Sequence, residues 1–345
     1  MVRRVARGRA TESSLAHRPD RRGRRGDRAG RRGRAMNCGY AHPGYWASLA
    51  PTERVLHLAR SGGGLVLRSI PGTDRYDATG PYPLFLCEDW SLLADDFAAL
   101  DAEPVSVVCV LDPFAPDQAK DALRLAFPDV FRPYKAHHVV DLAASWETSI
   151  SNHHLRNARK AMMQAEVAVS ESPSSHLEEW AALYAGLVRR HAIQGPARFS
   201  KRALAEQLSV PGAVLFRTAT DGVLTGATLW YRCMDRAYYH LGAYTEAGYQ
   251  GSVSHAIFLT ALRWFAERDV RWLDLGAGAG VTHDASDGLN RFKRGWANGT
   301  RIAFLGGRIL DADAYGKLSA GFRGGNETYF PAYRAHTHMS DSQGV

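Results

Sequence analysis

The sequence predicts a mixed α/β fold (α+β), with a largely antiparallel sheet flanked by helices. Helix-like and strand-like segments alternate through the first part of the chain, which argues against an all-helical or all-strand class. In the second part, three consecutive strand-like segments precede a long amphipathic helix and one more strand. The stretch that follows this helix, residues 271–297, reads RWLDLGAGAGVTHDASDGLNRFKRGWA and holds the densest set of candidate functional residues.

Residues 1–35 differ in composition from the rest of the chain. They contain 13 arginines and three acidic residues, a net charge of +10, whereas the whole chain carries +8, so that the remainder is slightly acidic at −2. A segment rich in Arg and Gly and poor in large apolar residues is expected to be disordered. It is interpreted either as a nucleic-acid-binding arm or as an upstream extension without a role, with Met36 as the natural start.

The remaining length predicts two domains. We expect an N-terminal domain over residues 36–142, a C-terminal domain over 143–315 and a tail over 316–345. No apolar segment reaches the ~20 residues that a membrane-spanning helix needs. These observations favour a cytoplasmic protein.

The cysteines and histidines predict neither a disulfide nor a structural metal. The four cysteines lie far apart, without C-x-x-C spacing or a histidine at ligand spacing: Cys38, Cys87, Cys109 and Cys233. This pattern is typical of a reduced protein. Each residue of the pairs His137-His138 and His153-His154 points to a different face of its helix or strand, so we expect surface histidines.

In the N-terminal domain, the apolar pattern predicts a helix at 46–60 and a strand at 64–70. After an irregular segment, a helix is predicted at 91–100 and a Val-rich strand at 104–111. A short strand at 139–142 closes the domain.

The C-terminal domain is predicted to begin with helices at 146–164 and 177–191. Strands at 213–218, 223–233 and 237–241 then form an antiparallel meander. The chain continues into a helix at 252–268, a strand at 270–275 and a last strand-like segment at 302–310.

Gly276, Gly278 and Gly280 follow the strand at 270–275 and are similar to the S-adenosylmethionine loop of class I methyltransferases. Such a loop closes the first βα turn of its fold, so that several strands should follow it. Only the segment at 302–310 does. A methyltransferase is therefore a remote alternative.

Four segments, in order, resemble the Fem family of aminoacyl-tRNA-dependent transferases and their relatives in the GNAT superfamily. They are LRNARKA at 155–161, DGVLTGATLWYRCMDRAYYHLGAY at 221–244, ALRWFAERDVRWLDLGAG at 261–278 and GLNRFKRGWA at 288–297. The resemblance implies tandem GNAT-like domains, of which the first is degenerate, with the acceptor bound between them.

One segment of the first domain supports the same resemblance. YDATGPY at 76–82 is similar to the family segment that shapes the acceptor pocket, whereas the following PLFLCEDW departs from the family's Gly- and Tyr-rich sequence. The acceptor is therefore open between a small metabolite and a cell-wall precursor.

Acyl transfer to an amine passes through a tetrahedral oxyanion, which a cation in a water-poor cleft stabilises. Lys293 is the candidate cation, and the resemblance implies that it faces the reacting carbonyl. Its neighbours Phe292 and Trp296 are expected to stack on the donor. Alternatively, Lys293 extends from a strand edge while these two rings lie in the core.

The general base is open among four residues that no sequence signature separates: Asp274, His240, Tyr244 and Asp77. Asp274 is taken as the catalytic candidate, although an Asp before a Gly-rich turn also commonly binds loop amides. Substrate-assisted proton transfer is the alternative. The remaining residues expected to bind the substrate lie near strand ends or in the first domain: Asp77, Tyr82, His240 and Tyr244.

The donor is inferred from a turn at the start of the helix at 252–268. Acetyl-CoA-dependent GNAT enzymes hold a pyrophosphate on an Arg/Gln-x-x-Gly-x-Gly/Ala turn. Here the turn reads GYQGSV at 248–253 and is incomplete, although Gly251 and Ser252 still suit a phosphate contact. We therefore expect aminoacyl-tRNA as the donor and partner, with acetyl-CoA as the alternative and no tightly bound cofactor.

Basic residues near the predicted site are the candidate tRNA contacts. Three of them share one helix face because they lie three or four residues apart, and two more flank Lys293: Arg156, Arg159, Lys160, Arg291 and Arg294. An ordinary solvated helix face would equally explain the first three. A non-catalytic binding scaffold is the last alternative.

Overall fold

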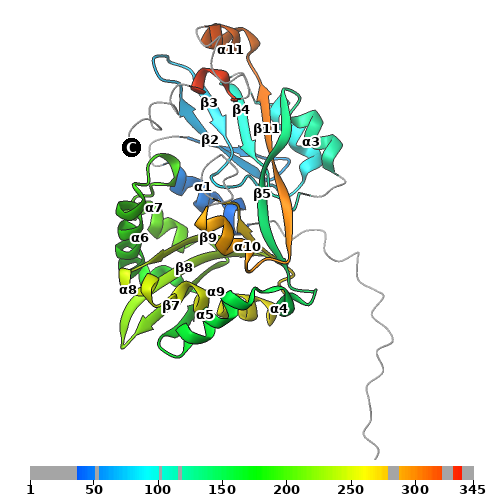
Figure 1. Cartoon of the computed structure of the whole chain (residues 1–345). Coiled ribbons are helices and arrows are strands. Elements are labelled where there is room, and N and C mark those ends of the chain that lie inside the picture. The colour runs from blue at the N-terminus through cyan, green and yellow to red at the C-terminus, as the bar shows by residue number, and fades with distance from the viewer. Residues whose placement is uncertain are drawn as a thin grey trace, which may run out of the picture. The chain divides into compact units, whose positions relative to one another are not determined.

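One mixed sheet runs through the residues that the computed structural model describes, which are 37–50, 54–100, 103–115, 119–278, 287–320 and 329–335. Its 11 strands have the order β1-β2-β3-β4-β11-β5-β10-β9-β8-β7-β6 (Figure 1). In chain order the strands are β1 (Val55–Leu58), β2 (Gly63–Ser69), β3 (Tyr76–Thr79), β4 (Pro104–Val110), β5 (Val130–Asp141), β6 (Glu166–Ser170), β7 (Ala213–Thr220), β8 (Val223–Cys233), β9 (Arg236–Tyr244), β10 (Trp272–Gly276) and β11 (Gly299–Ile309).

The sheet is largely antiparallel, as expected. Only β3 with β4 and β9 with β10 pair in parallel among the described strands. The predicted meander is confirmed by the antiparallel pairing of β7 with β8 and of β8 with β9.

Helices cover both faces of the sheet. They are α1 (Pro43–Leu49), α2 (Leu93–Ala98), α3 (Lys120–Ala126), α4 (Trp146–Ser149), α5 (Asn152–Met162), α6 (Leu177–His191), α7 (Lys201–Leu208), α8 (Glu246–Gln250), α9 (Val253–Ala266), α10 (Gly288–Arg294) and α11 (Ala312–Ser319). Trp180 of α6 and Leu204 of α7 pack in one core cluster with Tyr231 of β8. Phe258 of α9 packs with Trp230 of β8 in a second cluster. Trp230 and Tyr231 are adjacent on the strand and therefore point to opposite faces of the sheet, so the two clusters lie on opposite faces.

Two helices differ from their predicted bounds for local reasons, and a third helix was not predicted. The helix predicted at 46–60 ends at Leu49, and β1 follows it. The helix predicted at 146–164 is divided into α4 and α5, because Ile150 is extended and the Ser151 hydroxyl caps α5 by accepting from the His154 amide. The segment at 288–294 is a helix, capped by the Asp287 side chain.

The expected boundary near residue 142 does not divide the sheet. β11, assigned from the sequence to the C-terminal domain, pairs with β4 on one side and β5 on the other. The two long strands β5 and β11 lie side by side in Figure 1. The described residues belong to one compact unit, Ala35–Val345.

The described part of the expected tail packs on the N-terminal strands. Tyr333 lies in a small core cluster with Ile70 and Val105, and its hydroxyl is 2.8 Å from the Ser106 Oγ. Within the described ranges, no helix combines the length and the apolar character that crossing a bilayer requires.

The expectation of reduced cysteines is wrong for one pair. Cys38, near the start of the described chain, forms a disulfide with Cys233 at the end of β8, 195 positions later. Cys87 and Cys109 are buried thiols. Sequence spacing gave no sign of the pair because tertiary folding brings the two residues together.

The expectation of surface histidines is wrong for three of the four residues. His137, His138 and His154 are buried, and His153 is exposed. His137 and His138 point to opposite faces of β5, as adjacent strand residues must, and each finds a polar partner there.

Candidate active site at the end of strand β10

The parallel pairing of β9 with β10 is short. It runs from Trp272↔Arg236 to Asp274↔Tyr238, and β9 then continues to Tyr244 without a partner in β10. Gly276, the last residue of β10, has a φ of +78°, a conformation that favours glycine. The two strands thus separate at the point where the candidate catalytic residues lie.

Helix α10 brings Lys293 to this point. The Lys293 side chain is 7% exposed, and its Nζ donates to the Ala277 carbonyl oxygen at 2.6 Å. Nζ lies 5.6 Å from the centre of the Tyr239 ring. A Cβ on Gly276 would come within 3.0 Å of Nζ, so a side chain at this position would crowd the ammonium.

Burial makes the Lys293 ammonium unusually acidic. Desolvation lowers the pKa of Lys293 to about 8, while the Asp274 carboxylate acts in the opposite direction. The neighbouring Lys135 ammonium lowers this pKa further, and Asp287 opposes the shift. A cation placed in such a water-poor position acts far more strongly on a developing negative charge than one in bulk water.

Asp274 lies on the middle of β10 and is 2% exposed. Its Oδ1 accepts from the Gly276 amide at 2.7 Å, which confirms the expected contact with the loop backbone. Both carboxylate oxygens also lie within 3.0 Å of the His137 Nδ1 on the neighbouring strand β5. Asp274 therefore belongs to a buried carboxylate–histidine pair, which its own sequence context did not predict.

The position of α10 is fixed by contacts with two other elements. His138 Nε2 lies 2.6 Å from the Asn290 Oδ1, and His154 Nε2 lies 3.0 Å from the Phe292 carbonyl oxygen. The Ser151 amide donates to the Gly295 carbonyl oxygen. Strand β5 and helix α5 thus hold both ends of the helix that carries Lys293.

Phe292 and Trp296 do not lie in an open cleft with Lys293. Trp296 is fully buried and stacks on Phe258, with ring centres 5.9 Å apart. Phe292 packs edge-on against the same Phe258 ring at 4.8 Å. Both rings belong to the core between α10 and α9. They therefore lie in the core, as in the alternative interpretation of Lys293. Lys293 itself projects from a helix and not from a strand edge.

Asp77 is separate from this site. It is fully buried on β3, and three strands lie between β3 and β10, which at ~4.8 Å per strand spacing corresponds to roughly 19 Å. Its carboxylate pairs with Arg68 at 2.9 Å and with Arg334 at 3.0 Å. Asp77 therefore links β2, β3 and the C-terminal segment, and its expected place in the cleft is not supported.

His240 and Tyr82 belong to an aromatic cluster on another part of the sheet. His240 Nδ1 lies 3.1 Å from the Tyr40 hydroxyl, and its Nε2 lies 3.4 Å from the Gln207 Oε1. Burial lowers the pKa of His240 to about 3. Tyr82 is 43% exposed and faces Phe199 at a centroid distance of 6.4 Å, so it lies at the edge of this cluster.

Tyr244 ends β9 and faces the turn into α9. Its ring centre lies 5.5 Å from that of Tyr249. The amides of Gly251 and Ser252 donate to the Ala247 and Tyr249 carbonyl oxygens. These two amides are therefore engaged within the turn, and the phosphate contact expected of them would have to displace internal hydrogen bonds.

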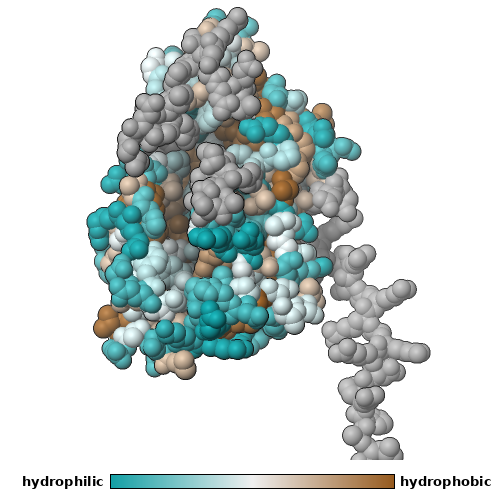
Figure 2. Space-filling model, in the orientation of Figure 1, coloured by the Kyte–Doolittle hydropathy of each residue, from teal (hydrophilic) through white to brown (hydrophobic). Residues whose placement is uncertain are grey.

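The basic candidates are exposed on two helices that contact each other. Arg156, Arg159 and Lys160 lie on α5, and Arg291 and Arg294 lie on α10. Figure 2 shows mainly hydrophilic residues over the lower half of the face in view, where Figure 1 places α5 and α6. The two helices meet through the His154–Phe292 contact.

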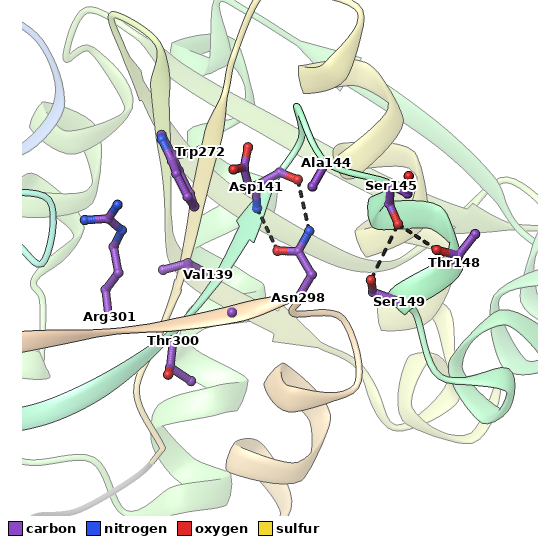
Figure 3. Close-up of a pocket in the computed structure, with 11 residues that line it drawn as sticks. Val139, Asp141, Ala144, Ser145, Thr148, Ser149, Trp272, Asn298, Thr300 and Arg301 are labelled. Carbon is purple, nitrogen blue, oxygen red and sulfur yellow. Dashed lines mark hydrogen bonds between the residues drawn. The ribbon is translucent and has the colours of Figure 1, made fainter.

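A separate pocket of about 550 Å³ lies beside the first residue of β10 (Figure 3). Trp272 and Arg301 line one side, and hydroxyl residues of α4 line the other, with Asn298 between them. Asn298 bonds the backbone of Asp141 through both its side-chain oxygen and its nitrogen. The pocket does not include Lys293, Asp274 or His137, so we do not place the chemistry there.

Sequence reasoning missed two buried polar residues of this region, His137 and Asp112. Asp112 Oδ2 accepts from Arg236 Nη1 at 3.1 Å and from the Tyr238 hydroxyl at 3.3 Å. Burial raises the pKa of Asp112 to about 6, and Arg236 opposes the shift. Neither residue lies in a motif. His137 reaches the site through the pairing of β5 with β10, and Asp112 contacts β9 through its side chain.

Comparison with protein families supports the resemblance to the GNAT superfamily that the sequence indicated. Residues 150–294 match the family described as "Acetyltransferase (GNAT) domain". The curated proteins gave no match.

Two solved structures share the fold over most of the chain. FemX is 14% identical with a TM-score of 0.56, and the match covers 79% of this chain and 92% of FemX. The C-terminal domain of a putative lysylphosphatidylglycerol synthetase from Agrobacterium fabrum is 16% identical with a TM-score of 0.52, over 78% of this chain and 89% of that one. At these identities the likeness concerns the fold. Residues 150–294 thus form a GNAT-type domain, and the chain is an acyltransferase whose mixed α/β fold is similar to that of FemX.

Proposed function

We propose that the protein forms an amide or peptide bond by transferring an aminoacyl group from an aminoacyl-tRNA to an amine acceptor. The observation that carries this proposal is the buried Lys293 ammonium where β9 and β10 separate. An ammonium has three N–H donors, and within the described residues Nζ uses one of them, on the Ala277 carbonyl oxygen. The other two can bind the oxyanion that forms when the amine attacks the donor carbonyl.

Two features favour an aminoacyl-tRNA over an acyl-CoA as the donor. The turn before α9 lacks the complete glycine pattern of a pyrophosphate site, and the amides of Gly251 and Ser252 are already bonded within it. In addition, α5 and α10 expose five basic residues close to the site, although the body of the chain is slightly acidic. Such a local cluster suits a nucleic-acid backbone.

The acceptor is proposed to be a primary amine on a small metabolite or a cell-wall precursor. The fold is similar to that of FemX and of the C-terminal domain of a putative lysylphosphatidylglycerol synthetase, which agrees with aminoacyl transfer. The segment after Tyr82 departs from the Fem pattern, and this departure favours the metabolite.

The proposal is tested by comparing two donors with the full chain. The protein is mixed with total tRNA charged with radiolabelled amino acids, or with labelled acetyl-CoA, and with hydroxylamine or glycinamide as a general amine acceptor. We expect turnover of charged tRNA, and a ~10²–10³-fold loss in Lys293→Ala, as is typical for removal of one oxyanion donor. Turnover of acetyl-CoA alone would instead establish an N-acetyltransferase, and turnover of neither donor would contradict the proposal.

A second test concerns the basic residues. The triple variant Arg156→Glu, Arg159→Glu and Lys160→Glu is expected to weaken binding of charged tRNA and to flatten its dependence on salt concentration, because fewer counterions are released. Arg202→Glu on α7, where Arg202 pairs with Glu206, is the matched control. Equal binding by the triple variant and the control would exclude α5 from the tRNA site.

A further inference from the structure

His137 and Asp274 have the geometry of a base and the carboxylate that orients it. The two side chains are 8% and 3% exposed, and His137 Nδ1 lies 3.0 and 2.9 Å from the two carboxylate oxygens. A carboxylate on Nδ1 holds the proton on that nitrogen and leaves the lone pair on Nε2. Within the described residues, Nε2 of His137 makes no hydrogen bond.

The pair is connected to Lys293 through one residue. The Gly276 amide donates to the Asp274 Oδ1. A Cβ atom at Gly276 would lie 3.0 Å from the Lys293 Nζ. Lys293 and the histidine–carboxylate pair are therefore linked through Gly276, at the end of β10.

Other buried groups of the region are less suited to accept a proton. Both ring nitrogens of His154 and of His240 are engaged in hydrogen bonds. The carboxylate of Asp112 accepts from Arg236, from Tyr238 and from the Phe114 amide. His138 faces the opposite side of β5 and binds Asn290.

The charged groups that surround His137 come from three strands. Asp274 lies on the neighbouring strand β10. On β5, Lys135 precedes His137 by two residues and lies on the same face. Arg301 of β11 lies directly opposite His137. The Arg301 guanidinium lies over the Trp272 ring at 4.7 Å and the Phe114 ring at 5.0 Å. Asp274 is therefore the group that bonds the imidazole.

We propose that His137 is the general base of the acyl transfer and that Asp274 is its positioning residue. This inference rests on the proposed function. As the neutral amine attacks the donor carbonyl, His137 Nε2 removes one proton from the amine nitrogen while the N–C bond forms. The tetrahedral intermediate then collapses, the C–O bond of the donor ester breaks, and the imidazolium returns the proton to the leaving ribose oxygen. The products are an amide and an uncharged tRNA, without a net change in protons.

The test uses the full chain, total charged tRNA and two acceptors of different basicity. With glycinamide, His137→Gln is expected to lower kcat by ~10²–10⁴-fold, the usual contribution of a general base. With hydroxylamine, which is a strong nucleophile without base assistance, the loss should be at most ~10-fold. Added imidazole should partly restore the activity of His137→Ala with glycinamide and should not restore that of Lys293→Ala.

Controls separate a base from a merely structural histidine. His191→Gln changes an exposed histidine at the end of α6 and should leave both rates unchanged. Asp274→Asn should lower kcat with glycinamide more than with hydroxylamine. Equal losses of His137→Gln with both acceptors, or the absence of imidazole rescue, would overturn the assignment. Inactivity of the wild-type chain with both acceptors would instead count against the proposed function.

A readout independent of turnover is available from NMR of ¹⁵N-histidine-labelled protein. At the assay pH, the His137 Nδ1 should carry a proton in a strong hydrogen bond, and Nε2 should show the shift of an unprotonated nitrogen. A protonated Nε2 together with a bare Nδ1 would contradict the proposal. The Asp274→Asn variant should change this tautomer, because an amide can donate to Nδ1.

Discussion

The Nζ atom of Lys293 lies 2.6 Å from the carbonyl oxygen of Ala277, just beyond the end of β10. This bond fixes a buried cation just after β10 and, among the described residues, leaves two of its protons for a ligand. A glycine at position 276 suits this arrangement, because a side chain there would crowd the Lys293 ammonium. The consequences of this arrangement can be measured without knowledge of the substrate.

Lys293→Met is expected to raise the free energy of unfolding at pH 7. The pKa of Lys293 is lowered from 10.5 to about 8 by burial, and each unit corresponds to ~1.4 kcal/mol. Because the folded value lies below the unfolded one, the charged lysine costs roughly 3 kcal/mol below pH 8, and the cost disappears as the pH rises from 8 to 10.5. Loss of the bond to Ala277 offsets about 1 kcal/mol of the gain.

Urea denaturation at pH 7 and pH 10 checks this prediction. The advantage of Lys293→Met over the wild type should shrink at the higher pH, and the exposed substitution Lys160→Met should show no advantage at either pH. A constant difference between wild type and Lys293→Met from pH 7 to 10 would show that the lysine is not buried in its charged form.

The pH dependence of turnover should reflect the same group. If the Lys293 ammonium stabilises the oxyanion, kcat falls as the pH rises through about 8. Lys293→Arg should remove this alkaline limb, since a guanidinium keeps its proton throughout. Its kcat at pH 7 is expected to be lower than that of the wild type, because a planar guanidinium places its N–H donors differently from an ammonium. An unchanged alkaline limb in this variant would assign it to another group.

His240 should make the protein sensitive to acid. Burial lowers its pKa from 6.5 to about 3, so the unfolded chain binds a proton first as the pH falls. Stability is therefore lost progressively from pH 6.5 down to 3, by roughly 5 kcal/mol at the lower limit. His240→Gln should shift the midpoint of acid unfolding to lower pH, as followed by circular dichroism, whereas His191→Gln should leave it in place.

The disulfide between Cys38 and Cys233 should contribute measurably to stability. It closes a loop of 195 positions, and removal of such a cross-link typically costs ~2–5 kcal/mol by the chain-entropy argument. Dithiothreitol should therefore lower the Tm of the wild type. Without the reductant, the double variant Cys38→Ser, Cys233→Ser should have the Tm of the reduced wild type. Adding the reductant should not change the Tm of this variant. An identical Tm of both proteins under oxidising conditions would contradict the bond.

The sequence predicted elements well where one face is consistently apolar. Helix α6 has its predicted bounds, and α9 follows the stripe that includes Ile257, Phe258 and Phe265. Strand β5 was predicted over only its last residues, because Arg132, Pro133 and Lys135 give it no apolar pattern. It is a strand because β11 pairs with it from Val130 to Val139 and β10 pairs with its last residues.

The site was predicted in part for a similar reason. Lys293 and Asp274 stand out in a short stretch of sequence, and the structure brings both to the end of β10. His137 lies 137 positions before Asp274, and their contact depends on the antiparallel pairing of β5 with β10. A single sequence carries no record of such a pairing.

The insertion of β11 between β4 and β5 determines when this protein can acquire its fold during synthesis. β1 to β5 leave the ribosome first, but β4 and β5 have no direct pairing and each presents an unpaired edge. Those edges are closed only after residue 309 has emerged. The edges of β4 and β5 therefore stay open to intermolecular strand pairing until nearly the whole chain has been made.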